Sequence, residues 1–204
     1  MKKIIVGKLR KRASQILKRQ DVRIVAVTGS VGKTSAKDAI VAVLAQKYSV
    51  RGSAKNYNNE IGVPLSIIGV DSPGRSIFGW LRVLRKARKL ARRKRKDYPQ
   101  WLVLEMGADR KGDIEYLVDF AQPDIAVVTA VAPAHSEFLG SVSDIATEKG
   151  KLVQGLSEGG TAVLNGDDPY TRDMATLSPG KTLLYGFGGN EPVKAYDISM
   201  DFPE

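Results

Sequence analysis

The chain has 204 residues, no cysteine and a formal net charge of +10, from 32 Lys and Arg against 22 Asp and Glu. This length can bury a sizeable core, and the lack of cysteine excludes disulfide bonds and thiolate chemistry. No apolar run approaches the roughly 20 residues of a membrane span, and the apolar part of the first segment is too short for a convincing signal peptide. The composition is consistent with a globular cytoplasmic protein.

The charge is unevenly distributed along the chain. Residues 1–23 carry +8 and residues 75–97 carry +10, so the remaining residues carry −8. This distribution argues against a protein that binds nucleic acid over its whole surface, and for local basic patches on an acidic body. Residues 1–23 alternate apolar and basic groups and are predicted to be a basic lead-in segment. It is expected to form a short helix that is either solvated or an arm that binds a partner.

A phosphate-binding loop is indicated after this segment. Ile24–Val27 is an apolar run typical of a buried strand, and an amphipathic pattern predicts a helix from Lys33 to about Gln46. The turn between them is rich in glycine, which is the arrangement of a P-loop. The full pattern would place a glycine at position 27, where this chain has valine. The sequence therefore predicts a shortened variant of the loop.

The chemistry of the loop follows from its residue types. Gly29 and Gly32 allow the backbone to bend so that its N–H groups point inward, and the helix N-terminus adds partial positive charge. Lys33 is expected to reach the β- and γ-phosphates of a nucleotide, and the Thr34 hydroxyl to bind Mg²⁺. The predicted nucleotide-binding residues of the loop are Gly29, Ser30, Val31, Gly32, Lys33, Thr34 and Ser35.

A stretch rich in asparagine comes next. Asn56, Asn58 and Asn59 precede Gly62 and Pro64, so the stretch is expected to begin as a loop. Asparagine side chains in loops commonly satisfy turns. Beside a P-loop they can equally hold phosphate oxygens or metal-bound water, and both interpretations stay open.

Residues 77–96 form a basic amphipathic pattern and are predicted to be a helix within an insertion at about 75–97. One interpretation is a helix on an anionic membrane surface, with Phe78 and Trp80 as interfacial anchors and the protein peripheral to the inner face of the membrane. The other is a helix packed on its own domain with a solvated basic face. Nucleic acid is a less favoured partner, because the segment has few aromatic residues. The apolar stripe is expected to comprise Ile77, Trp80, Leu81, Val83, Leu84, Ala87, Leu90 and Ala91, with Arg88 intruding on it.

Two predicted strands end beside side chains that can bind a metal. Trp101–Glu105 ends on a carboxylate, and Ile125–Thr129 leads to His135, the single histidine of the sequence. The carboxyl ends of parallel strands form the crevice in which α/β sheets bind ligands. Glu105 is therefore a candidate Mg²⁺ ligand, or alternatively a carboxylate bonded to a loop. A lone histidine is commonly structural, but its place after a strand makes His135 a candidate ligand that Glu137 would help to hold.

Lys149 interrupts the apolar face of a helix predicted over Ser141–Leu156. It lies seven residues after Val142 and four after Ile145, so it shares their face. An ammonium on an apolar stripe is costly unless it is paired, neutralised or able to reach water along the surface.

These motifs together resemble the Mur ligase family, the ATP-dependent amino acid and peptide ligases of cell-wall synthesis. The resemblance runs from about Ile24 to Asp168 through TGSVGKTS, NNEIGVP, EMGA, AHSE, EKGK and NGDD, in that order. NNEIGVP and EMGA are most similar to the MurF type, which adds D-alanyl-D-alanine to the stem peptide. The chain departs from the family pattern at Thr129-Ala130, where asparagine is common, and at Gly166, where alanine is usual.

The resemblance implies roles for individual residues. Asn58 and Asn59 match positions at the terminal phosphate of ATP, and Glu105 matches a magnesium ligand. Lys149 matches a lysine that CO₂ carbamylates in many members, which yields an anion able to bind Mg²⁺. The implied metal ligands are Thr34, Glu105, His135 and carbamylated Lys149, and the implied catalytic residues are Lys33, His135 and Lys149.

The resemblance also implies a fold and an activity. Residues 24–204 are expected to form a three-layer α/β domain with a mostly parallel, P-loop NTPase-like sheet flanked by helices. The implied activity joins a carboxylate of a peptidoglycan-precursor-type substrate to an amine, through an acyl phosphate made from ATP. Family members also have an N-terminal UDP-sugar domain and a C-terminal domain, and both are expected to be absent from these residues, so turnover by them alone is uncertain. The alternatives are a folylpolyglutamate or polyglutamate synthase-like ligase, a regulatory P-loop NTPase, and a module that binds a membrane surface or partner.

Overall fold

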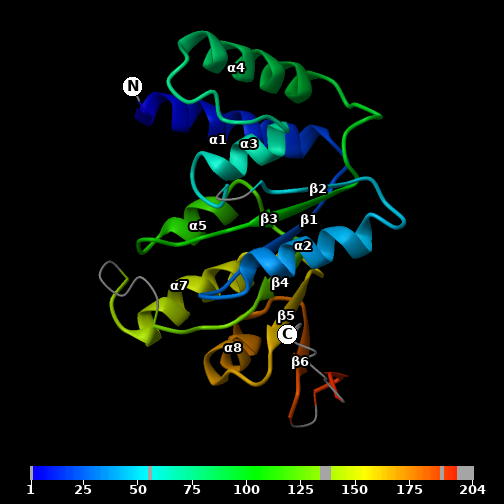
Figure 1. Ribbon diagram of the computed structural model, residues 1–204, viewed down its shortest axis with the longest axis vertical. Helices are drawn as coiled ribbons and strands as arrows, with labels where there is room; N and C mark the ends of the chain where they lie inside the picture. Colours follow the sequence, from blue (N-terminus) through cyan, green and yellow to red (C-terminus); the bar gives the residue numbers. More distant parts are fainter. Residues whose placement is uncertain (1, 55–56, 134–138, 189–190, 197–204) are drawn as a thin grey trace, which may run out of the picture.

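A computed structural model describes residues 2–54, 57–133, 139–188 and 191–196 (Figure 1). The strands in this part of the chain are β1 (Arg23–Thr28), β2 (Val50–Gly52), β3 (Trp101–Glu105), β4 (Ile125–Val128), β5 (Thr161–Asn165), β6 (Lys181–Gly186) and β7 (Val193–Lys194). The helices are α1 (Lys2–Arg19), α2 (Lys33–Leu44), α3 (Gly62–Ile68), α4 (Ile77–Arg92), α5 (Asp113–Val118), α7 (Val142–Gln154), α8 (Pro169–Asp173) and the 3₁₀ helix η1 (Met174–Leu177).

The strands form one sheet in the order β2-β3-β1-β4-β5-β6-β7, and each runs parallel to its neighbours. The register pairs Val27 with Glu105 on β3, and Thr28 with Val128 on β4. The carboxyl ends of β1, β3 and β4 therefore meet at one edge of the sheet, where α/β proteins bind ligands.

Helices cover both faces of the sheet, and the apolar residues of β1 explain how. Successive strand residues point to opposite faces. Ile24 and Ala26 join the core beneath α1, α3, α5 and α7, whereas Val25 and Val27 join the core beneath α2. A strand buried on both faces is typical of a parallel sheet between two helical layers. The expected three-layer α/β fold is confirmed.

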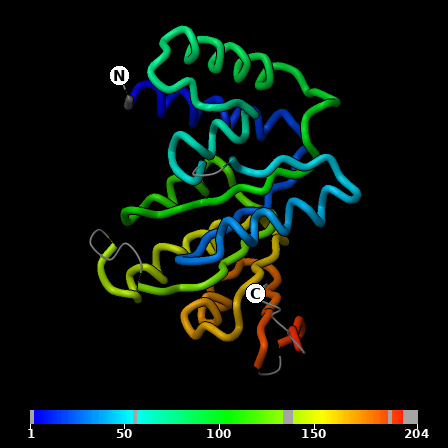
Figure 2. The backbone as a smooth tube through the Cα atoms, viewed as in Figure 1, coloured from blue at the N-terminus to red at the C-terminus, as the bar shows by residue number. Residues whose placement is uncertain are grey.

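The first segment belongs to the core rather than being a solvated lead-in. Leu9, Ala13 and Ile16 are fully buried on α1. The outer helix α4 packs against α1 on the side away from the sheet, as the chain path in Figure 2 shows. The Gln20 carboxamide holds the two helix ends together, because its Nε2 donates to the carbonyl oxygens of Leu90 (2.7 Å) and Arg93 (3.0 Å).

The buried face of α4 differs from the predicted stripe. Val83 and Ala87 are buried, but Ile77 and Leu81 are 64% and 48% exposed. The face towards α1 is rotated, and its partly buried members are Trp80, Leu84, Leu90 and Ala91. Arg88 consequently lies on the exposed side, so it does not intrude on the packed face.

Several predicted boundaries shift slightly in the structure. The helix predicted to reach about Gln46 ends at Leu44, and α3 begins at Gly62 within a stretch expected to start as a loop. Among the helices that the structure describes, none has the length and apolar character needed to cross a membrane.

Candidate active site

The P-loop joins β1 to α2 through two glycines with positive φ angles. Gly29 has φ of 148° and Gly32, which precedes α2, has φ of 78°. A Cβ atom on Gly29 would collide with the Thr129 hydroxyl, so the loop needs glycine for space as well as conformation. Lys33 Nζ donates to the carbonyl oxygens of Gly29 (2.8 Å) and Ser30 (3.1 Å). Its ammonium therefore lies over the loop, where phosphates are bound in P-loop proteins.

The end of β4 supports this loop from the other side. Thr129 Oγ1 donates to the carbonyl oxygen of Val31 at 2.6 Å, and the Ser30 N–H donates to the carbonyl oxygen of Ala130 at 2.7 Å. Ser30 Oγ lies 3.0 Å from both the N–H and the carbonyl oxygen of Ala132. Thr129, which stands where the family commonly has asparagine, thus fixes the backbone of the loop.

Glu105 connects the P-loop helix to the asparagine stretch. Thr34 Oγ1 donates to Glu105 Oε2 at 2.9 Å, and Asn58 Nδ2 donates to Glu105 Oε1 at 3.1 Å. The carboxylate is only 5% exposed. The next residue but one, Gly107, donates its N–H to the carbonyl oxygen of Asn58 at 2.8 Å, and a Cβ there would lie 3.0 Å from Asn58 Nδ2. The structure thus brings together three residues that the sequence singled out separately.

Asn59 and Ser35 are placed differently from this cluster. Asn59 Oδ1 accepts from the N–H groups of Ile61 (3.1 Å) and Gly62 (3.0 Å), so it satisfies the start of α3, as the turn interpretation expected. Ser35 is exposed in the first turn of α2, beside the loop. Val31 is 59% exposed at the tip of the loop.

Lys149 is buried on α7, as its place in the apolar stripe predicted. It is 4% exposed, and its ammonium has no hydrogen-bond or ion-pair partner among the residues that the structure describes. The pKa of Lys149 is lowered to about 8, mainly by burial and also by the nearby Lys33 ammonium, whereas Glu148 opposes the shift. The effect of Lys33 shows that α7 presents Lys149 towards the P-loop.

His135, Glu137 and Asn56 lie outside the described residues, so their predicted roles stay predictions. Across the described chain, no three His, Asp, Glu or Cys side chains come together in a way that could hold a metal ion. Thr34 and Glu105 nevertheless present adjacent oxygen atoms beside a phosphate-binding loop. Mg²⁺ prefers oxygen ligands and needs few from the protein when phosphates and waters complete its shell. These residues therefore fit a magnesium–nucleotide complex.

The sequence did not single out Lys37, which lies beneath the site. Its side chain is buried on α2, and its Nζ donates to the carbonyl oxygen of Ser53 at 2.9 Å and pairs with Asp38 at 3.0 Å. Ser53 Oγ in turn accepts from the backbone N–H of Glu105 at 3.1 Å. Lys37 thus fixes the end of β2 against the strand that carries Glu105.

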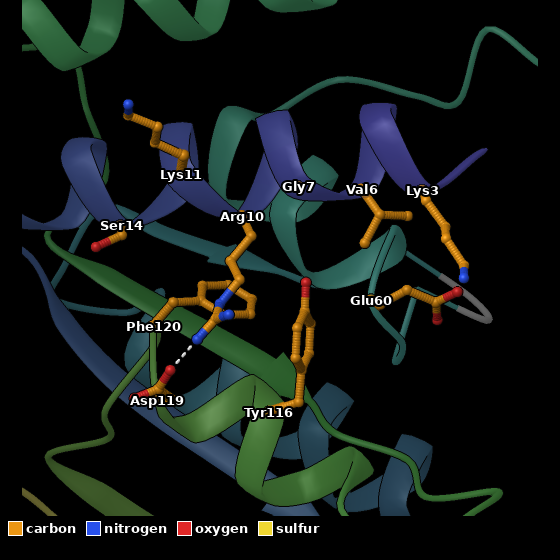
Figure 3. A pocket seen from close by; sticks show the side chains of 10 residues that line it. All are labelled: Lys3, Val6, Gly7, Arg10, Lys11, Ser14, Glu60, Tyr116, Asp119 and Phe120. Atoms are coloured by element: carbon orange, nitrogen blue, oxygen red, sulfur yellow. Dashed lines mark hydrogen bonds and ion pairs between the residues drawn. The ribbon is translucent and has the colours of Figure 1, made fainter. Parts of the chain in front are cut away.

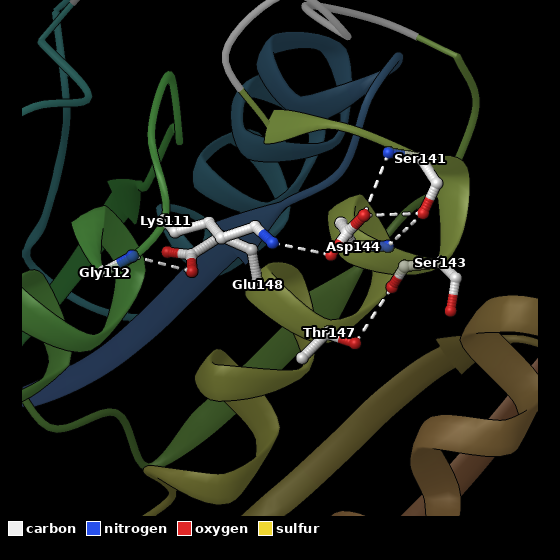
Figure 4. A network of polar contacts seen from close by, with 7 residues as sticks. All are labelled: Lys111, Gly112, Ser141, Ser143, Asp144, Thr147 and Glu148. Carbon is white, nitrogen blue, oxygen red and sulfur yellow. Dashed lines mark hydrogen bonds and ion pairs between the residues drawn. The ribbon is translucent and has the colours of Figure 1, made fainter.

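A polar network between α7 and the loop after β3 was also missed (Figure 4). Both Glu148 oxygens accept backbone N–H groups at 2.8 Å, from Gly112 and Ile114 at the start of α5. Lys111 Nζ donates to Asp144 at 2.6 Å, and Asp144 and Ser141 cap the start of α7 together. The network ties the helix that carries Lys149 to the loop that follows Glu105. The signal in the sequence is the position of Glu148, three residues after Ile145 and four before Leu152, which borders the predicted apolar face.

Glu148→Gln is expected to lower the free energy of unfolding by about 2–3 kcal/mol. The amide would turn an NH₂ group towards one of the two backbone N–H groups that now donate to the buried carboxylate. One hydrogen bond to a charged group is then lost, which costs about 2–3 kcal/mol. Urea denaturation of both variants measures it, with the exposed Glu158→Gln as control, expected within about 0.5 kcal/mol of wild type. Equal effects of the two substitutions would contradict the assigned network.

Two hollows share lining residues, and one of them reaches Asn58, the hydrogen-bond partner of Glu105. One has a volume of about 760 Å³, begins at Asn58 and Gly107, and is bordered by α5. The second, about 790 Å³, lies between α1 and α5 and shares Val6, Glu60 and Tyr116 with the first. Figure 3 shows Tyr116 pointing towards α1, with Arg10 paired to Asp119 beside it. Together they form the α1–α5 groove, which runs from Asn58 and Gly107 to the space between α1 and α5.

Comparison with known proteins decides the family. The sequence model of the Mur ligase middle domain matches residues 27–75 and 85–202. The chain belongs to this family. The resemblance noted in its motifs is thereby confirmed.

Individual Mur ligases agree with this assignment. The chain is 32% identical to UDP-N-acetylmuramoyl-tripeptide–D-alanyl-D-alanine ligase of Bacillus subtilis over 192 residues, which cover 94% of the chain and 36% of that protein. It superposes on MurF of Thermotoga maritima in complex with ADP with a TM-score of 0.72 and 34% identity, covering 90% of the chain and 37% of that structure. MurF of Acinetobacter baumannii shares the fold, with a TM-score of 0.70 and 21% identity over 87% of the chain and 34% of that structure. The chain thus spans about a third of the length of these Mur ligases.

The structure also shows how this Mur ligase middle domain uses its NGDD segment. Asp168 Oδ2 accepts from the N–H of Val131 at 2.6 Å, and Asp168 Oδ1 accepts from the N–H of Tyr170 at the start of α8. Asp167 accepts from the N–H groups of Phe187 (2.8 Å) and Gly188 (3.2 Å). Both carboxylates therefore hold loops at the carboxyl edge of the sheet.

Proposed function

We propose that this chain is the ATP-binding core of a MurF-type ligase, which joins a carboxylate of a peptidoglycan precursor to the amine of D-alanyl-D-alanine. The observation that carries the proposal is the contact of Thr34 with Glu105 at 2.9 Å, beside a P-loop whose lysine lies over its backbone. The Thermotoga maritima structure supports it, because that 34% identical MurF was solved with ADP.

The proposed reaction needs two displacements. A substrate carboxylate oxygen attacks the γ-phosphorus of ATP, the bond to the bridging oxygen breaks, and ADP leaves an acyl phosphate behind. The amine then attacks the acyl carbon, phosphate departs with its oxygen, and the nitrogen loses a proton to give the amide. Such chemistry depends on positioning and on neutralising phosphate charge rather than on a protein nucleophile. Lys33 and the N–H groups of the P-loop would do this, and the α1–α5 groove would admit the carboxylate substrate.

Two sets of residues would hold magnesium. Thr34 and Glu105 would bind one ion, and His135 with carbamylated Lys149 a second. Mg²⁺ supplies positive charge that neutralises phosphate oxygens. The burial of Lys149 supports carbamylation, because CO₂ adds to a neutral amine with loss of a proton. With a pKa of about 8, roughly a tenth of the side chain is neutral at pH 7, far more than for an ordinary lysine.

The same proposal covers domain organisation and location. Residues 24–204 would form the ATPase unit together with α1, whose apolar face is buried in the same core. Residues 75–97 would be a basic insertion, of which 76–84 fall outside the family match. ATP as a substrate places the reaction in the cytoplasm. Contact of residues 77–96 with an anionic membrane surface is a separate proposal, since the ligase chemistry does not require it.

Turnover by the purified chain tests the proposal. The chain is mixed with Mg²⁺, ATP, UDP-N-acetylmuramoyl-tripeptide and D-alanyl-D-alanine, and the products are followed by mass spectrometry. We expect Mg²⁺-dependent ATP binding by the chain, and any amide product should need both organic substrates. Failure to bind ATP would overturn the proposal. So would ATP hydrolysis that neither organic substrate affects, or an amide product formed from folate and glutamate instead.

A further inference from the structure

Helix α4 begins with an exposed apolar tip formed by Ile77, Phe78 and Leu81. Their exposed fractions are 64%, 79% and 48%. They occupy neighbouring positions on the first two turns, on the side of α4 that faces away from α1. The tip lies within residues 76–84, which fall outside the match to the Mur ligase middle domain. Three large apolar side chains are thus exposed to water in a segment that the family match does not include.

A basic ridge continues from this tip along the exposed side of α4. Its members are Arg82, Arg85, Arg88, Lys89, Arg92 and Arg93, and all are exposed. Within the described residues none of the six has a carboxylate partner. Lys18 and Arg19 at the end of α1 lie beside Arg92 and extend the ridge. The ridge is thus an uncompensated positive surface on a chain whose residues outside 1–23 and 75–97 carry a net charge of −8.

The helix holds the tip and the ridge in fixed relative positions. Ser76 Oγ accepts from the N–H of Gly79 at 3.0 Å and caps the start of α4. Trp80, expected from the sequence to be an interfacial anchor, is instead partly buried, and its indole N–H donates to the carbonyl oxygen of Gly74 at 3.0 Å. Lys86 Nζ donates to the carbonyl oxygen of Gly69 at 2.7 Å. The buried face thus anchors the helix and leaves Phe78, not Trp80, pointing outward.

We propose that α4 docks on an anionic lipid bilayer, with Ile77, Phe78 and Leu81 inserted at the headgroup level and the basic ridge over acidic headgroups. A helix with an apolar end and unpaired cations on the same face suits such an interface. The phosphates of a nucleic acid would neutralise the charge of the ridge, but they would not bury an apolar tip of this size. Two copies joined through this face would bring two segments of charge +10 together. The membrane is the partner that complements both features.

Vesicle sedimentation of the full chain tests the apolar tip. The vesicles contain phosphatidylcholine, with or without about 30 mol% phosphatidylglycerol, because anionic lipid is what attracts a basic segment. We expect binding to the anionic vesicles, weakened about tenfold by Phe78→Ser, since a buried phenyl ring contributes that much or more. Val43→Ser is the matched control, because Val43 is 72% exposed on α2 and should bind like wild type.

The basic ridge is tested in the same assay. Arg85→Gln with Lys89→Gln should weaken binding about 30-fold, whereas Lys47→Gln with Lys181→Gln should leave it nearly unchanged.

Absence of binding, or equal binding to neutral and anionic vesicles, would overturn the proposal. Concentration-dependent dimers in analytical ultracentrifugation that Phe78→Ser abolishes would assign the face to a second copy. Tighter binding to DNA than to vesicles, insensitive to Phe78→Ser, would assign it to nucleic acid. ATP binding by these variants, measured separately, keeps this result independent of the ligase proposal.

Discussion

Lys33→Met is expected to weaken binding of magnesium ATP by at least about 100-fold. The Lys33 ammonium lies over the carbonyl oxygens of Gly29 and Ser30, at 2.8 and 3.1 Å, where a nucleotide's phosphates would replace them as partners. Loss of a charged hydrogen bond costs about 1.5–3 kcal/mol, and loss of its Coulomb attraction to the phosphates adds to this. Isothermal titration calorimetry with ATP and Mg²⁺ measures the change in affinity directly.

The control for this variant is Lys47→Met. Lys47 is an exposed lysine just after the end of α2, so its substitution removes the same charge without touching the loop. We expect ATP affinity within about twofold of wild type, because exposed charges at this distance are screened by salt. An unchanged affinity in Lys33→Met would refute the P-loop assignment. An equal loss of ATP affinity in both variants would show that the affinity depends on the net charge of the protein and not on the position of Lys33.

Lys149→Met is expected to separate stability from activity. Lys149 is 4% exposed, and burial disfavours its charged form, so replacing it with an apolar side chain of similar length should stabilise the fold by roughly 1–3 kcal/mol. Amide formation should nevertheless fall at least about 100-fold, since a carbamate at this position would be lost. Urea denaturation and the turnover assay measure the two effects, with Lys151→Met as a control on the same helix.

The protonation of Lys149 gives a second test of the same environment. Its pKa is about 8 in the folded chain and 10.5 in the unfolded one, so the unfolded state alone holds the proton between these pH values. The free energy of unfolding should therefore rise with pH across this window in the unmodified wild type, and Lys149→Met should lack that rise. Carbamate itself is detected by ¹³C NMR with labelled bicarbonate. A signal that persists in Lys149→Met, or full activity of that variant, would count against the assigned role.

The order of chemical motifs was evident from the sequence. The apolar run before Gly29 indicates a strand and the amphipathic pattern after Gly32 indicates a helix. A glycine-rich turn between a strand and a helix is the arrangement of a P-loop. Glu105 was identified because the carboxyl end of a buried strand lies in the crevice where α/β sheets bind ligands, and Lys149 because a charge on an apolar helix face is costly. In each case the signal is local, since it depends on residues a few positions apart.

Only the tertiary structure decided which of these residues meet. Parallel pairing of β1 with β3 brings Thr34 into contact with Glu105, 71 residues away in the sequence. Asn58 donates a hydrogen bond to the same carboxylate, whereas Asn59 bonds to the backbone at the start of α3. The contributions of Lys37 and Glu148 were not predicted, because a buried lysine on α2 and an acid on α7 acquire their roles from backbone groups on other elements. The orientation of α4 was also decided at this level. Its periodicity fits more than one buried face, and packing against α1 selected the face that leaves Ile77, Phe78 and Leu81 exposed.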